Sequence, residues 1–126
     1  MGLDCYAVKM VDADPKLFES VPNGLHHGLF SRTSNGFYGS RYAAFVSAIT
    51  DATLYDELLS VEQVQHMADA LEDWIADHPG ESWADPQDIS LPGHDAAVPL
   101  SPEEITALTQ WFRIAADNDC AVMNWF

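Results

Sequence analysis

The chain has 126 residues, 48% of them hydrophobic, so it is long enough to bury a core and too apolar for a disordered segment. We expect one acidic globular domain spanning residues 1–126. Twenty Asp and Glu against five Lys and Arg give a formal net charge of −15. This charge disfavours direct binding to nucleic acids and to anionic membranes, because both require Lys and Arg to contact phosphate.

The chain has no apolar run long enough for a membrane span and no basic, apolar leader at its N-terminus, so we expect a cytoplasmic protein. The electrostatic field of such a chain attracts cations and basic proteins. Its acidity has three open explanations: solubility, adaptation to high salt, and a functional acidic surface, DNA mimicry included.

Residues 3–11 are predicted to form a strand, since Cys5, Tyr6 and Val8 favour β structure. Pro15 belongs to the segment that ends this strand, and residues 16–21 are predicted to form a short helical turn. The next segment, residues 24–45, joins this region to the first predicted helix and contains the glycines and arginines considered below.

Three helices are predicted. Ser40 is expected to cap the first, and residues 54–59 to add a further helical turn after it. Ser60 and Gln63 fit a capping box at the start of the second, and Ser101 followed by Pro102 marks the start of the third. Each helix has an apolar face, formed in turn by Tyr42, Phe45, Val46 and Ile49; by Val61, Val64, Met67, Ala68, Leu71, Trp74 and Ile75; and by Ile105, Leu108, Trp111, Phe112 and Ala115.

Residues 80–100 show no period and are predicted to form a long connection, functional or containing an additional strand, that Trp83 attaches to the body. Residues 120–126 are predicted to form the last strand. The expected fold is therefore α+β, with a small, mainly antiparallel sheet that contains the N- and C-terminal strands and is covered by about three helices. Cys5 and Cys120 are expected to be free, buried thiols.

The segment around the first helix start is the leading candidate site. Gly36 and Gly39 would let an anion approach the backbone, and exposed helix amides would favour its negative charge. This reading predicts a phosphate or carboxylate site. The alternative is that the glycines make turns and the arginines pair with acids. The residues of the predicted site are His26, His27, Arg32, Gly36, Gly39, Ser40 and Arg41.

Metal and cofactor binding have little support. His26 and His27 are adjacent and point to opposite faces of an extended segment, so they are poorly placed to bind one metal ion. On the second helix, His66 shares one face with Glu62, Asp69 and Asp73, which is where an amphipathic helix is polar in any case. We therefore predict no metal and no cofactor.

Several short motifs resemble a poorly characterised group of small bacterial and phage-associated proteins. They are Gly2-Leu3-Asp4-Cys5-Tyr6, Gly36-Phe37-Tyr38-Gly39-Ser40-Arg41-Tyr42, Trp111-Phe112-Arg113 and Cys120-Ala121-Val122. That group has no established activity, so the resemblance implies no catalytic residue.

The charge and the weak catalytic inventory lead us to expect a non-catalytic binding or regulatory domain that contacts a basic protein. The alternative is a small-anion binding protein or enzyme that uses residues 24–41. The sequence indicates no oligomeric state.

Overall fold

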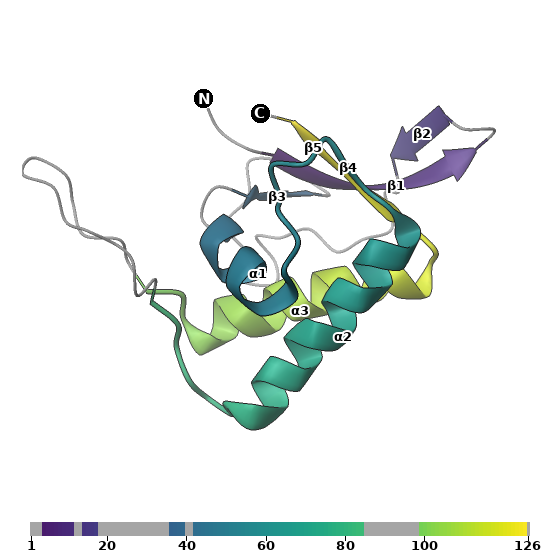
Figure 1. The fold of residues 1–126 in the computed structure, drawn as a ribbon. Coiled ribbons are helices and arrows are strands. Elements are labelled where there is room, and N and C mark those ends of the chain that lie inside the picture. The colour runs from purple at the N-terminus through teal and green to yellow at the C-terminus, as the bar shows by residue number, and fades with distance from the viewer. Residues whose placement is uncertain (1–3, 12–13, 18–35, 40–41, 85–98, 126) are drawn as a thin grey trace, which may run out of the picture.

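The computed structural model describes residues 4–11, 14–17, 36–39, 42–84 and 99–125. Within these ranges, three helices lie on one side of an antiparallel sheet (Figure 1). The predicted α+β fold is confirmed, with the N- and C-terminal strands both in the sheet. In chain order the elements are β1 (Asp4–Val11), β2 (Asp14–Leu17), β3 (Gly36–Tyr38), α1 (Ala43–Thr50), β4 (Leu58–Leu59), α2 (Val61–Asp77), α3 (Pro102–Asp117) and β5 (Ala121–Trp125).

Strand β1 lies inside the sheet. It pairs with β5 along one edge and with β2 and β3 along the other, so the order is β2-β1-β5-β4 with β3 beside β1. The β1–β5 pairing runs from Asp4 opposite Trp125 to Val8 opposite Ala121. The two strands furthest apart in the sequence are therefore neighbours near the middle of the sheet.

The predicted helical turn at residues 16–21 is wrong where the structure describes it. Lys16 and Leu17 belong to β2 and pair with Lys9 and Val8 of β1. Pro15 is compatible with this strand because β2 lies at an end of the described strand order. On the outer side of β2 the described sheet has no neighbouring strand to which Pro15 would have to donate a backbone hydrogen bond.

Capping boxes begin the two long helices, as predicted for α2. The Gln63 N–H donates to Ser60 Oγ at 3.1 Å, and the Ser60 N–H donates to Gln63 Oε1 at 2.9 Å. Ser101 and Glu104 repeat the arrangement at α3, where Pro102 occupies the first helical position directly after Ser101. These caps satisfy amides that have no partner within the helix, which fixes where each helix starts.

The first helix begins later than predicted. Ala43 is its first residue and Tyr42 is its N-cap, without a side-chain cap, so the prediction of Ser40 as N-cap is wrong. The Val46 N–H donates to the Tyr42 carbonyl at 2.9 Å, so the helical hydrogen bonds begin at Tyr42, whose own N–H donates to the Gly39 carbonyl at 2.9 Å. The predicted apolar face is nevertheless confirmed, because Tyr42, Phe45 and Val46 are fully buried.

Residues 54–59 do not form the predicted helical turn. Asn124 of β5 donates from its backbone to the Glu57 carbonyl at 2.9 Å and from its side chain to the Asp56 carbonyl at 2.7 Å. These bonds hold the segment along β5, where it becomes the short strand β4. Leu58 of β4 is consequently exposed.

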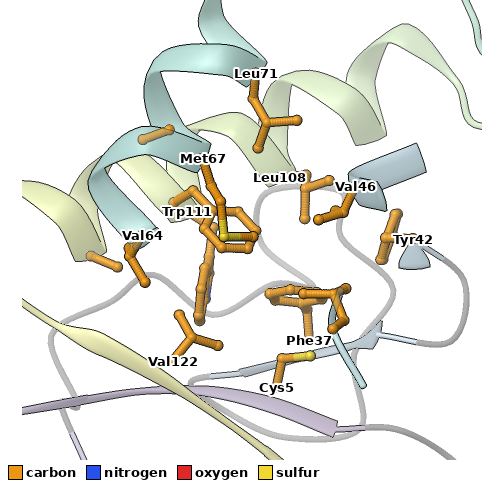
Figure 2. Packing of buried hydrophobic residues seen from close by; sticks show 14 of the residues in the cluster. Cys5, Phe37, Tyr42, Val46, Val64, Met67, Leu71, Leu108, Trp111 and Val122 are labelled. Atoms are coloured by element: carbon orange, nitrogen blue, oxygen red, sulfur yellow. The ribbon is translucent and has the colours of Figure 1, made fainter. Parts of the chain in front are cut away.

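The apolar core lies between the sheet and the helices. Figure 2 shows Cys5, Phe37 and Trp111 in this layer, and the Phe37 and Trp111 rings meet edge to face at 4.8 Å. Trp83 forms a bridge with Leu100 and packs on Phe45 with ring centroids 5.3 Å apart. The predicted role of Trp83 in attaching the connection to the body is confirmed.

Candidate functional site

Only two of the predicted anion-site residues lie among those that the structure describes. Gly36 is part of β3, opposite Tyr6, and Gly39 is buried directly after that strand. Gly36 is therefore a strand residue and not part of a turn, whereas Gly39 lies after the end of the strand. The others lie outside the described residues: His26, His27, Arg32, Ser40 and Arg41.

The residue that precedes α1 is bonded to the first turn of α3. The Tyr42 hydroxyl donates to Glu104 Oε2 at 3.0 Å, while the Ser101 N–H donates to the other carboxylate oxygen at 3.4 Å. Glu104 therefore both completes the α3 capping box and accepts a bond from the side chain of Tyr42, which connects the two helices.

The two cysteines are free and buried, as predicted. Burial raises the pKa of the Cys5 thiol, and the neighbouring Asp4 carboxylate raises it further. Burial also raises the pKa of Cys120. Because a thiolate is the reactive form, these environments do not favour a cysteine nucleophile.

The outer surface of α2 is strongly acidic. The helix carries five carboxylates and contains no Lys or Arg, and all five side chains are exposed. We call this surface the outer face of α2, comprising Glu62, Asp69, Glu72, Asp73 and Asp77. The exposed face that the sequence predicted is therefore present.

Arg113 of α3 compensates the middle of this face. Its guanidinium donates to Asp69 at 2.6 Å, binds Glu72, and lies 3.6 Å from Asp117. Hydrogen bonds to Asp69 and then to Glu72 raise the pKa of Arg113 above its already high value. Sequence reasoning missed this cluster, although the four-residue spacing of Arg113 and Asp117 was a signal.

A hollow of about 450 Å³ lies beside the first turns of α2. Its described lining includes Asp51, Asp56, Glu62 and His66, and contains no Lys or Arg. In the part of the chain covered by the structure, no three His, Cys, Asp or Glu side chains form a group suited to a metal ion. This hollow is therefore an acidic depression of the surface, without a group of side chains suited to a metal ion among the described residues.

A groove of about 330 Å³ separates the end of α2 from the start of α3. Its walls include the stacked rings of Trp74 and His78, 4.4 Å apart and inclined by 14°. Glu81 and Glu103 also line it, and none of its described lining residues is Lys or Arg. We call it the α2–α3 groove. The sequence placed Trp74 in the core, and the structure leaves it partly exposed.

The signal that sequence reasoning overlooked was the spacing of Trp74 and His78. Four residues apart, they lie one turn apart on the same side of the helix, directly before Pro79 and Gly80 end it. Nothing in the sequence linked this pair to Glu103, which the packing of α3 on α2 brings to the same groove.

Comparisons with protein-family models, curated proteins and solved structures found no match to this chain. Among the described residues, no helix combines the length and apolar character required to cross a membrane.

Proposed function

We propose that this protein is a small cytoplasmic binding or regulatory domain that contacts a basic protein through the outer face of α2. The observation that carries the proposal is the set of five exposed carboxylates in a helix without Lys or Arg. An acidic face of this kind attracts Lys- and Arg-rich surfaces and speeds their encounter.

The distribution of charge along α2 supports this function. Asp73 and Asp77 lie in the last turns, and no basic residue is present in the last turn. The helix dipole places partial negative charge at that end, so each carboxylate there lowers helix stability. Helix stability therefore does not account for these carboxylates, whereas binding to a cationic surface does.

The competing anion-binding function has less support. The described part of its predicted site contributes two glycines and no Lys or Arg. The net charge of −15 adds a long-range barrier to anions. The same charge opposes direct nucleic-acid binding.

The test is calorimetric titration with a synthetic peptide rich in Lys and Arg, from low to high KCl. We expect affinity to fall steeply with salt, because screening weakens exposed charge pairs. Asp73→Asn/Asp77→Asn should weaken binding roughly tenfold, as two carboxylate contacts together contribute about 1.4 kcal/mol. The matched control, Asp14→Asn/Asp119→Asn, removes the same charge at exposed positions outside α2.

Equal losses in the two double variants would show that overall charge, and not this face, attracts the peptide. Absence of peptide binding together with a steep rise of unfolding free energy in KCl would instead indicate adaptation to high salt. Either result contradicts the proposed function.

A further inference from the structure

We propose that the α2–α3 groove binds an arginine side chain of the basic partner. This inference rests on the proposed function and assigns one contact within it. Three features of the groove carry it: a stacked aromatic pair, two carboxylates on its lining, and fixed helix ends on both sides.

The aromatic pair offers the groove a flat surface that is held in place. His78 Nδ1 lies 2.9 Å from the Trp74 carbonyl oxygen. A carbonyl oxygen can only accept, so Nδ1 donates this bond and fixes the imidazole to the backbone of α2. The stacked indole and imidazole thus present a fixed π surface on one wall of the groove.

The charges around the groove fit a cation. Glu81 lines it from the segment after α2 and Glu103 from α3, and none of the described lining residues is Lys or Arg. Glu103 is exposed in the first turn of α3, and Glu81 follows the turn at Gly80, whose φ of +71° favours glycine. A cation bound in the groove is attracted by both carboxylates.

Arginine matches this combination better than lysine does. Its guanidinium is planar and stacks on aromatic rings, while its five N–H donors can serve two carboxylates together. A lysine ammonium is more strongly hydrated and lacks a flat face. Charge complementarity therefore selects a basic side chain, and the stacked rings select arginine among the basic residues.

The groove is built on fixed elements. Trp74 packs edge to face on Phe45 with centroids 5.3 Å apart, and the Ser101–Glu104 capping box fixes the start of α3. The backbone N–H of His78 also donates to the Ile75 carbonyl at 3.2 Å, which holds the chain as it leaves α2. A preformed pocket of this kind requires little ordering when it binds a ligand.

Hexa-arginine and hexa-lysine peptides distinguish this contact from general attraction. In calorimetric titrations at low salt we expect hexa-arginine to bind more tightly, and in NMR spectra we expect it to shift the indole Nε1–H resonance of Trp74. Glu81→Gln/Glu103→Gln should weaken hexa-arginine binding about tenfold and reduce its advantage over hexa-lysine. The charge-matched control is Asp14→Asn/Glu57→Gln, at exposed positions outside both the groove and the outer face of α2.

A second experiment places an arginine of the chain itself in the groove. Thr106 is exposed and lines the groove, so Thr106→Arg supplies a guanidinium there, whereas Gln65→Arg adds the same charge to an exposed position elsewhere on α2. We expect only Thr106→Arg to remove the arginine preference. Thermal melts followed by circular dichroism check that each variant is as stable as the unaltered protein before its binding is compared.

The outcomes separate the two proposals. If hexa-arginine binds in a salt-dependent way but Glu81→Gln/Glu103→Gln and the control variant weaken it equally and the Trp74 resonance does not shift, the groove is not an arginine pocket and the acidic binding face stands. If neither peptide binds the unaltered protein, the proposed function and the pocket both fail.

Discussion

The α2–α3 pair holds acidic side chains in two different surroundings. Near its middle, Asp69 and Glu72 share the guanidinium of Arg113. In the groove at its end, Glu81 and Glu103 line a depression whose described walls contain no Lys or Arg. The difference shows that the acidity of this protein is not uniform: in one region an arginine of the chain itself joins two helices, and in the other no described lining residue is Lys or Arg. The proposed arginine contact concerns the second region.

The largest expected effect lies beneath this surface, where both regions depend on the same apolar contacts. Leu71 is fully buried on the inner side of α2. Leu71→Ala should lower the unfolding free energy by about 2–5 kcal/mol, from lost burial and the cavity left behind. Urea denaturation measures it, with exposed Asp73→Ala as the control, expected within about 0.5 kcal/mol of the unaltered protein. Similar losses would show that α2 is not anchored by its inner face.

An intermediate effect is expected at the compensated region. Arg113→Gln leaves Asp69, Glu72 and Asp117 without their shared cation and should lower the unfolding free energy by about 1 kcal/mol at low salt. The side chain of Arg113 is 31% exposed, so screening already limits this contribution. Added KCl should shrink the loss, because it weakens the repulsion that remains. A loss that is unchanged at high salt would assign the role of Arg113 to packing.

The smallest effect has the opposite sign. Asp77 ends α2 where the helix dipole is negative, and no basic residue lies in that last turn. Asp77→Asn should therefore raise the unfolding free energy by about 0.3–1 kcal/mol. Glu62→Gln at the other end of the helix is the control, because removing a carboxylate from the first turn should lower stability. Thermal melts of both variants at low salt measure the contrast, and a stabilisation by both would reduce the dipole argument to overall charge.

The helices could be predicted from the sequence because their signals are local. Ser60 with Gln63 satisfies helix amides within a few residues, Ser101 caps the third helix just before Pro102, which has no N–H to satisfy, and the apolar spacing defines the buried faces. The sheet was predicted less completely. Lys16 and Leu17 become a strand through pairing with β1, and residues 58–59 through hydrogen bonds that Asn124 makes to the preceding carbonyls. Such partners lie far away in the sequence, so local propensity does not show them.

The site shows the same limit. The acidic face of α2 follows a helical period and was predictable, while the groove requires Trp74, His78 and Glu103 to meet across two helices. The Arg113 cluster joins α2 to α3 in the same way. The anion site predicted around residues 24–41 stays a prediction, since most of its residues lie outside those that the structure describes.

The pairing of β1 with β5 has a consequence for how the chain acquires its fold. Asp4 lies opposite Trp125, so an interior pairing of the sheet joins residues that lie far apart in the sequence. During synthesis, α1, α2 and α3 are made before Ala121–Trp125, so the completed sheet cannot cover the apolar sides of these helices until β5 is added. Contacts this distant in sequence are slow to form, because a long loop has to close before they contribute. We therefore expect the β1–β5 pairing to form late in folding, and the strongly negative charge of the chain to help keep incompletely folded copies apart until then.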